Sequence, residues 1–182
     1  STINVGWKLA DLGYKTLIVD LDAQCNTSMT ISKDYVNDIA KTKNNLSDCI
    51  NDENGSFFDY KVKTRHDNLD LLGATILLDE TEENMKQQAI PTHILQSKLD
   101  SESINYYDFI LFDTPPSKHS KLLHNALVIS DYYWYIIGAE DIWALDARGV
   151  VDKVVESIKR LNKKLNPLPV LLTKYRSNVL QC

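Results

Sequence analysis

Two short apolar runs, each ending in an aspartate, constrain the fold of this chain more than any other feature. Thr16 to Val19 (TLIV) leads into Asp20, and Phe109 to Phe112 (FILF) leads into Asp113. Runs of this length and composition are typical of strands buried on both faces of a parallel sheet. The carboxyl ends of such strands form the edge at which open α/β sheets bind ligands. We therefore expect Asp20 and Asp113 to lie at a ligand-binding edge.

The residues after each strand are consistent with a charged site. Asp22 follows Asp20 by two positions, and neighbouring carboxylates are best tolerated beside a cation or a water awaiting activation. Asp113 is followed by Thr114 and two prolines, which stop the strand. An acid at the tip of a buried strand is how Walker B sites hold Mg²⁺ near nucleotide phosphates. Either strand alone could run into an ordinary polar turn, but the two together predict a site.

Helical patterns alternate with the apolar runs along the chain. We expect strands over residues 62–72, 132–137 and 170–173, and helices over about 1–12, 118–129 and 144–165. Residues 31–60 indicate short helices and loops, and 81–100 a helical stretch interrupted by Pro91. This alternation predicts an α/β fold with a mainly parallel, doubly wound sheet and helices on both faces. We expect one nucleotide-binding domain over residues 1–182.

The composition excludes several classes of protein. With 182 residues, 43% hydrophobic and 25% charged, the chain is typical of a globular protein, and no apolar run reaches membrane-spanning length. The spacing of Cys25, Cys49 and Cys182 fits neither a disulfide framework nor a metal site, which favours a reduced, cytoplasmic protein. His66 and His93 have no partners at metal-ligand spacing, so we expect them to be structural or surface residues.

The net charge of −5 is unevenly distributed. Residues 148–182 carry eight basic residues against two acids, a balance of +6, which leaves −11 for the rest. Lys153, Arg160 and Lys164 share one face of the helix expected over 144–165. A basic end on an acidic body can be the electrostatic footprint of a nucleic-acid-binding protein. It is equally typical of a solvated helix face with cations at its C-terminus.

Several segments resemble the ParA/Soj/MinD group of deviant Walker ATPases. DLDAQCNTS (20–28) is similar to the group's DxDPQGNxT segment, and YDFILFDTPPS (107–117) to its Walker B segment YDYILIDTPPS. The resemblance continues in the group's order through NLDLLGAT (68–75), NALVISD (125–131) and LNPLPVLLTKY (165–175). It covers nearly the whole chain and implies a P-loop NTPase-like fold with ATP and Mg²⁺ as cofactors.

The phosphate-binding KGGxGKT loop of this group does not occur in the sequence. A register on Asn4, Gly13 and Asp22 places its lysine about two residues before Ser1. In an alternative register Ser1 and Thr2 end the motif, which shortens the first helix by two residues. We therefore interpret the chain as a piece of a longer protein, cut before the P-loop and also at its C-terminal side, which without that loop would be inactive.

The resemblance implies a role for each candidate residue in phosphoryl transfer from ATP to water. Asp113 would hold Mg²⁺ through a water molecule, and Asp22 would orient or polarise the attacking water as the catalytic residue. Asp20 would shape the metal shell or the turn. The other expected nucleotide contacts are Thr114, beside the metal-binding acid, and Lys174 and Tyr175, at a strand end where members of the group contact adenine.

The resemblance also implies partners. In the group, ATP closes two subunits into a homodimer that binds double-stranded DNA nonspecifically, and a centromere-binding adaptor of the ParB type stimulates hydrolysis. The DLDAQ and DTPPS segments and the basic end favour the DNA-partitioning branch, in a nucleoid-associated protein. If so, Lys153, Arg160 and Lys164 are the candidate DNA contacts.

Two other functions stay open on the sequence alone. One is a MinD-like ATPase that positions membrane or protein cargo, although these residues contain no C-terminal amphipathic membrane helix and we expect no membrane partner. The other is a non-catalytic interaction protein that keeps the fold but has lost hydrolysis. An iron–sulfur relative is excluded, because no cysteine occurs between Cys49 and Cys182.

Overall fold

The computed structural model describes residues 1–138 and 144–174, and for residues 144–151 only the backbone. By its internal contacts the chain divides into two units, one of residues 2–126 and one of residues 127–182 with Ser1. Each unit is described by itself below. The expectation of one domain over residues 1–182 stays a prediction.

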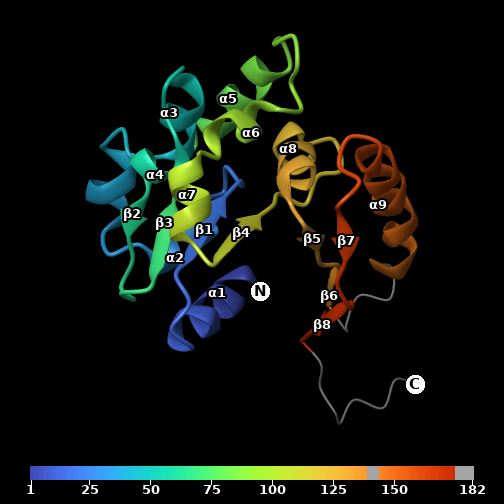
Figure 1. Cartoon of the computed structure of the whole chain (residues 1–182), viewed down its shortest axis with the longest axis horizontal. Helices are drawn as coiled ribbons and strands as arrows, with labels where there is room; N and C mark the ends of the chain where they lie inside the picture. Colours follow the sequence, from blue (N-terminus) through green and yellow to red (C-terminus); the bar gives the residue numbers. More distant parts are fainter. Residues whose placement is uncertain (139–143, 175–182) are drawn as a thin grey trace. The chain divides into compact units, whose positions relative to one another are not determined.

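The larger unit is built on a four-stranded sheet in the order β2-β3-β1-β4 (Figure 1). Its strands are β1 (Thr16–Asp20), β2 (Val62–Lys63), β3 (Leu69–Leu72) and β4 (Phe109–Asp113). β1 pairs in parallel with both β3 and β4, whereas the edge strand β2 runs antiparallel to β3. The mainly parallel sheet is therefore confirmed. The register pairs Asp20 directly with Asp113, so the two apolar runs end side by side.

Helices precede, connect and follow the strands of this unit. They are α1 (Thr2–Asp11), α2 (Asn26–Ile31), a π-helical turn (Val36–Ala40), α3 (Leu46–Asn51), α4 (Phe57–Tyr60), α5 (Leu78–Met85), α6 (Ile94–Lys98), α7 (Ser101–Tyr106) and α8 (Lys121–Ile129), which ends in the smaller unit. The short helices expected over 31–60 are present. Pro91 separates α5 from α6, as predicted for the interrupted helical stretch.

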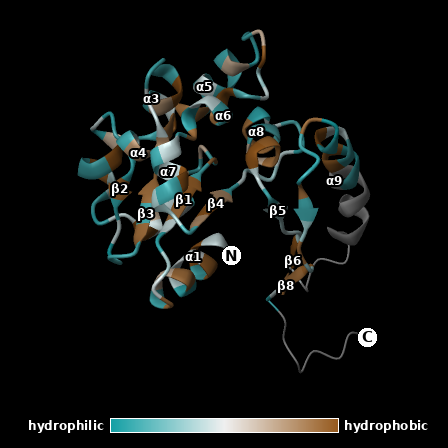
Figure 2. Cartoon of the chain, in the orientation of Figure 1, coloured by the Kyte–Doolittle hydropathy of each residue, from teal (hydrophilic) through white to brown (hydrophobic). Residues whose placement is uncertain are grey.

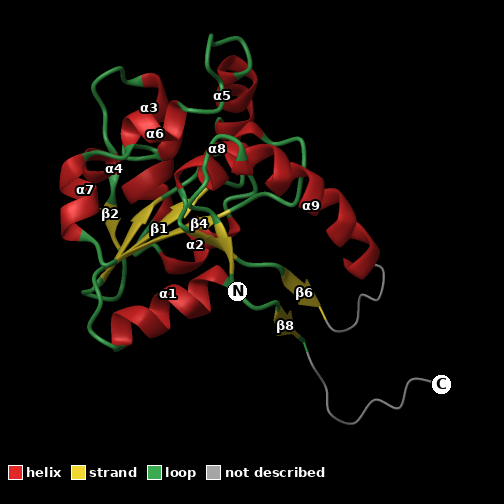
Figure 3. Cartoon of the chain, turned by 45° about the vertical axis from the view of Figure 1, so that its right-hand side comes forward, coloured by secondary structure: helices red, strands yellow, loops and turns green. Residues whose placement is uncertain are grey.

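Helices cover both faces of this sheet (Figure 3). α1 packs closely on one face, because a Cβ atom at Gly6 would lie only 2.6 Å from Ile18 Cδ1. On the opposite face the ring of Phe112 in β4 meets the ring of Phe57 in α4 at a centroid distance of 6.2 Å. Both contacts are apolar, which explains why the sequence builds each strand from uninterrupted hydrophobic residues rather than from an alternating pattern.

The core of the larger unit lies where α1 meets the sheet, and its strands form the most hydrophobic part of the unit (Figure 2). The core residues that pack together are Ala10, Ile18, Ile31, Ile39, Leu69 and Leu71. Every residue of β1 is buried, whereas β4 is half-buried and its first residue, Phe109, is 39% exposed. β4 is the outer strand of this sheet among the residues that the structure describes. The prediction of burial on both faces thus holds better for β1 than for β4.

The strand expected over 62–72 is wrong, because the chain turns back within it. Thr64 Oγ1 donates to Leu69 O at 2.6 Å and accepts the N–H of His66 at 3.1 Å. The N–H of Asn68 in turn bonds to Nδ1 of His66 at 3.2 Å. These bonds close a turn between β2 and β3 and give His66 the structural role that its lack of metal-ligand partners predicted.

The smaller unit contains two pairs of parallel strands and one long helix. Its elements are β5 (Tyr132–Tyr133), β6 (Ile136–Gly138), α9 (Ala144–Lys159), β7 (Asn166–Pro167) and β8 (Leu171–Thr173). β5 pairs with β7, and β6 pairs with β8. The parallel pairing agrees with the predicted fold class, but the single strand expected over 132–137 is in fact two.

The break between β5 and β6 follows from a proline in the partner segment. Leu168 donates its N–H to Tyr133 O at 2.9 Å, and the next donor to the same strand is Leu171, which bonds to Tyr135 O at 2.9 Å. The spacing of three residues instead of two marks a bulge that contains Pro169, which has no N–H to give to a ladder. The bulge at Pro169 therefore separates β7 from β8 at the point where β5 is separated from β6.

α9 ends at Lys159, six residues before the end expected from the sequence. The N–H groups of Leu161 and Asn162 both bond to Ile158 O at 2.8 Å, which tightens the last turn. The side chain of Asn162 donates to Leu127 O and Ser130 O at 3.0 and 2.7 Å, and so draws the chain away from the helix axis. The face predicted to carry three basic residues therefore does not exist as one helical face.

The buried thiol of Cys49 provides a test of the packing in the larger unit. Burial raises the pKa of Cys49 to about 12, so at pH 8 only about 10⁻⁴ of this thiol is the reactive thiolate. Iodoacetamide reacts with the thiolate, so its rate follows the thiolate fraction. We therefore expect it to alkylate Cys49 in the folded chain at least about 100-fold more slowly than in urea. Peptide mass spectrometry after timed quenching measures the two rates. Equal rates in both conditions would show that α3 is not packed as described.

Candidate nucleotide and metal site

The carboxylate of Asp113, at the end of β4, receives a hydroxyl group on each oxygen. Thr2 at the start of α1 donates from Oγ1 to Oδ1 at 2.6 Å, and Thr27 of α2 donates from Oγ1 to Oδ2 at 2.5 Å. These oxygens are hard donors of the kind that Mg²⁺ prefers. Among the described residues no group of three or more His, Cys, Asp or Glu side chains could hold a metal alone. The donor set therefore fits Mg²⁺ that is shared with phosphate oxygens and water.

The neighbouring carboxylate, Asp20, is buried completely and is bound on both oxygens. Oδ2 accepts the N–H and the hydroxyl of Ser28 at 2.9 and 2.7 Å, and Oδ1 accepts the N–H of Asp22 at 3.2 Å. Burial raises the pKa of Asp20 above its ordinary value and the charge of Asp113 adds to this, whereas the bonds from Ser28 and Asp22 oppose it. Asp20 therefore braces the turn after β1, and its expected share in the metal shell stays a prediction.

Asp22 is half-buried and stands in the turn that follows β1. Its Oδ1 accepts the N–H of Gln24 at 3.0 Å. Among the residues that the structure describes, no hydrogen bond reaches its second oxygen, Oδ2. A carboxylate that is oriented through one oxygen can bind a water molecule through the other. This geometry is compatible with the predicted catalytic role, which stays a prediction.

The turn passes from Asp22 into α2 through Cys25, which has left-handed backbone angles with φ at 57°. Glycine adopts this conformation most easily, and other residues there cost about 1–2 kcal/mol. The DxDPQGNxT pattern has glycine at the matching position. Because Cys25 is buried and burial raises the pKa of its thiol, we assign the thiol no chemical role in the site.

The remaining expected nucleotide contacts are Thr114, Lys174 and Tyr175. Thr114 is exposed and directly follows Asp113. Lys174 belongs to the smaller unit, is exposed, and has left-handed backbone angles with φ at 57°. Tyr175 lies outside the described residues. The structure thus brings Asp20, Asp22 and Asp113 together, whereas the roles of these other residues stay predictions.

The three candidate DNA contacts are all exposed, but they do not lie on one helix. Lys153 is in α9, whereas Arg160 and Lys164 follow its last residue. The N–H of Lys164 bonds to Asn162 Oδ1 at 3.1 Å, within the turn that ends the helix. A contact with DNA would therefore involve the helix end and this turn rather than a single helical face.

Sequence reasoning missed three hydroxyl groups that complete the acidic cluster. Thr2 and Thr27 bind Asp113 across 111 and 86 positions of sequence, and Ser28 binds Asp20. The available signals were the match of Ser28 to the last residue of DxDPQGNxT and the alternative register in which Ser1 and Thr2 end the phosphate-binding motif. The contact between Thr2 and Asp113 favours that alternative register, because a Ser or Thr of the P-loop and the Walker B acid hold Mg²⁺ together.

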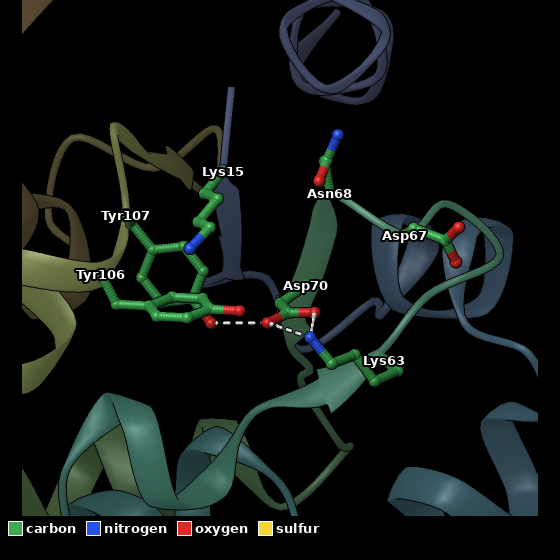
Figure 4. Close-up of a pocket in the computed structure, with 7 residues that line it drawn as sticks. All are labelled: Lys15, Lys63, Asp67, Asn68, Asp70, Tyr106 and Tyr107. Atoms are coloured by element: carbon green, nitrogen blue, oxygen red, sulfur yellow. Dashed lines mark hydrogen bonds and ion pairs between the residues drawn. The ribbon is translucent and has the colours of Figure 1, made fainter. Parts of the chain in front are cut away.

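A second polar cluster lies at the opposite, amino-terminal edge of the same sheet (Figure 4). Asp70 of β3 is buried and accepts hydrogen bonds from Tyr107 Oη at 2.7 Å and Lys63 Nζ at 3.0 Å. Burial and the bond to Asp70 raise the pKa of Tyr107. Lys15 Nζ lies 4.3 Å from the ring centre of Tyr106. Open α/β sheets bind ligands at the other edge, so we interpret this cluster as a structural ion pair.

Comparison with known proteins places this chain in a family. A family model described as an AAA domain (AAA_31) matches residues 1–168. The chromosome partitioning protein ParA of Caulobacter vibrioides is 28% identical over 179 residues, which make up 96% of this chain and 64% of ParA. The chain belongs to the ParA/Soj family. It spans 64–66% of the length of this and another curated relative, so the activity of a whole ParA-type protein is a proposal for it.

Two solved structures show the same fold as this ParA/Soj family member. Cobyrinic acid a,c-diamide synthase from Mycobacterium smegmatis, with bound ADP and magnesium, has a TM-score of 0.82 at 23% identity, covering 98% of this chain and 69% of its own. A plasmid partition protein from Borrelia burgdorferi has a TM-score of 0.81 at 24% identity, covering 99% and 75%. At these identities the likeness establishes the fold alone. Among the described residues, no helix is long and apolar enough to cross a membrane.

The hydroxyl of Ser28 provides a test of how the acidic cluster is stabilised. It donates to buried Asp20 and accepts the N–H of Ala74 at 2.8 Å, so Ser28→Ala leaves two buried groups without this partner. We expect the free energy of unfolding to fall by about 1–3 kcal/mol. Thr30→Ala in the same helix is the matched control, because within the described part of the chain this exposed hydroxyl bonds only to Asn26 O. Urea denaturation followed by circular dichroism measures both, and equal small losses would contradict the assigned role of Ser28.

Proposed function

We propose that the protein containing this chain hydrolyses ATP to ADP and phosphate and uses the reaction to partition DNA. The observation that carries the proposal is the oxygen-only cluster at the carboxyl end of β1 and β4, in which Thr2 and Thr27 hold Asp113 beside Asp20. This arrangement is the one that Mg²⁺ and nucleotide phosphates require from a Walker B site. The bound ADP and magnesium of the synthase with the same fold support this choice of ligands.

Each acidic residue would have a distinct task in hydrolysis. Asp113 and Thr2 would hold Mg²⁺, Asp113 through a water molecule, and the bound ion would neutralise charge that develops on the phosphates. Asp22 would orient the attacking water through its unbonded oxygen, because its other oxygen is fixed by Gln24. Asp20 would keep the turn closed, so that Asp22 stays in place when nucleotide binds. Phosphate-binding groups of a P-loop would complete the site.

The partitioning role is supported by the ParA relative and by the charge distribution. The relative at 28% identity is a chromosome partitioning protein, and the exposed basic residues of the smaller unit provide groups for phosphate contacts. In this proposal ATP closes a homodimer that binds double-stranded DNA nonspecifically on the nucleoid, and a centromere-binding adaptor of the ParB type stimulates hydrolysis. The cargo, plasmid or chromosome, would be set by that adaptor.

Substitution of Asp22 separates catalysis from nucleotide binding. In the full-length protein we expect Asp22→Ala to slow steady-state ATP hydrolysis by about 10²-fold, because the water loses its orienting base, while Mg²⁺·ADP still binds. Asp113→Asn should slow hydrolysis too and, unlike Asp22→Ala, should also weaken the Mg²⁺-dependent part of nucleotide binding. Phosphate release and calorimetric titration measure the two properties. The exposed acid Glu53 gives the control Glu53→Ala, and hydrolysis by Asp22→Ala at the normal rate would rule out the assigned role.

Charge reversal tests the proposed DNA surface. Changing Lys153, Arg160 and Lys164 together to Glu should abolish the ATP-dependent, salt-sensitive binding of nonspecific double-stranded DNA, because the phosphate contacts become repulsive. A matched control reverses three exposed lysines of the larger unit, Lys8, Lys41 and Lys43. Fluorescence anisotropy at several salt concentrations measures both variants. If both lose the same affinity, the effect is one of net charge, and the smaller unit is not the DNA surface.

A further inference from the structure

The segment of residues 114–120 joins the metal-binding carboxylate of Asp113 to helix α8. Apart from the half-buried Pro115 and the buried Ser120, its residues are exposed. Its first end is fixed where β4 pairs with β1, since Leu21 donates its N–H to Asp113 O at 2.9 Å. Its position near the nucleotide site therefore depends on what holds its second end.

Glu82 of α5 holds this second end. Its Oε1 accepts the backbone N–H of Lys121, the first residue of α8. A carboxylate is favourable at this point, because the first N–H groups of a helix have no partner within the helix and carry a partial positive charge. The contact is a long-range one, made across 39 positions of sequence. Glu82 thereby fixes the junction between the segment and α8.

A second contact, made by a residue of α8, reaches the middle of the segment. His124 Nε2 lies 3.1 Å from Lys118 O, and because a carbonyl can only accept, Nε2 carries the proton in this bond. Burial lowers the pKa of His124 below its ordinary value, while the nearby charge of Glu82 acts in the opposite direction. The carboxylate of Glu82 and the imidazole of His124 thus act on one short stretch, residues 118–121.

Helix α8, which takes part in the contacts of Glu82 and His124, is itself held in place by a buried side chain. Asn125 is buried completely, and its side-chain amide donates to Pro91 O at 2.7 Å and to Lys121 O at 2.8 Å. Its Oδ1 accepts the N–H of Leu95 at 3.0 Å. The bonds to Pro91 and Leu95 tie α8 to the segment before α6 and to α6 itself, whereas the bond to Lys121 O lies within α8. The backbone of residues 118–121 is therefore bound to an anchored helix, although the side chains of Lys118 and His119 are exposed.

We propose that Glu82 is a positioning residue for the nucleotide site, which acts by fixing the segment after Asp113 through the N–H of Lys121. His124 supports it through Lys118 O. This inference rests on the proposed ATPase function, because it assigns a catalytic consequence to the position of the segment. Glu82 is not one of the residues proposed above to hold the nucleotide or the metal, so it would act only through Lys121.

The test compares three single variants of the full-length protein. Glu82→Ala removes the acceptor, Glu82→Gln keeps an oxygen that can accept the same N–H, and Glu83→Ala is the matched control. Glu83 is the adjacent residue, its side chain is 69% exposed, and its ion-pair partner is Lys86. Hydrogen exchange with mass spectrometry measures protection of residues 114–121, and steady-state kinetics give kcat and KM for ATP.

For Glu82→Ala we expect exchange in residues 118–121 to accelerate about tenfold and kcat to fall about tenfold, with KM within about twofold of the unaltered protein. Glu82→Gln should restore both values to within about twofold, and Glu83→Ala should change neither. Rescue by Gln is the result that a general loss of folding would not give.

Three outcomes would overturn the inference. They are unchanged exchange in Glu82→Ala, accelerated exchange with an unchanged kcat, and a Glu82→Gln variant that behaves like Glu82→Ala. If the unaltered full-length protein binds Mg²⁺·ATP but does not hydrolyse it, the proposed function fails. In that case the exchange of residues 114–121 with Mg²⁺·ATP bound still decides whether Glu82 fixes the segment.

Discussion

The parallel pairing of β1 with β4 places two carboxylates side by side. The elements around them supply the hydrogen-bond donors that these carboxylates need. Asp20 and Asp113 are in register, and neighbouring strands lie about 4.8 Å apart, so the two acids repel each other. Asp20 is also buried, where an unpaired charge would be very costly. Their oxygens must therefore find donors. The donors come from the start of α1, from the turn after β1 and from α2.

Helix α2 supplies a donor to each acid from adjacent positions. Thr27 binds Asp113 and Ser28 binds Asp20, because consecutive residues of a helix point about 100° apart and so reach two adjacent strands. The register of α2 must be exact to within one residue for this to work. The left-handed conformation of Cys25, immediately before the helix, sets that register. Backbone strain at Cys25 is thus accepted where it orients two hydroxyl groups.

The sequence was sufficient for the features that depend on local pattern. The TLIVD and FILFD runs predicted β1, β4 and the meeting of Asp20 with Asp113, because parallel strands end at one edge. The hydrophobic pattern predicted the wrong helix or strand bounds where one side chain changes the path of the backbone. Asn162 ends α9 early, and the bulge at Pro169 divides the strand expected over residues 132–137. Neither effect is visible in hydrophobic periodicity, since it depends on which distant carbonyl or N–H group lies opposite.

The same limit applies to the site. The acids were predicted from their place at strand ends, but Thr2 and Thr27 became visible only when the fold brought them to Asp113 across 111 and 86 positions. Glu82 is a similar case, because an acid in the acidic stretch LDETEENM has no distinguishing pattern of its own. Its significance comes from the N–H group that α8 presents to it.

In the proposed function, the uneven charge of the sequence bears on which residues could bind ATP and which could bind DNA. The residues before Arg148 carry a balance of −11, which includes the three neighbouring carboxylates of the site, so a nucleoside triphosphate would be repelled there without a compensating cation. In the proposed function, bound Mg²⁺ and a P-loop would make that region accept one polyanion of defined geometry. DNA is a far longer polyanion and would be repelled by the same surface. In the proposed function, contacts with DNA would then fall to the basic residues 148–182, where the balance is +6.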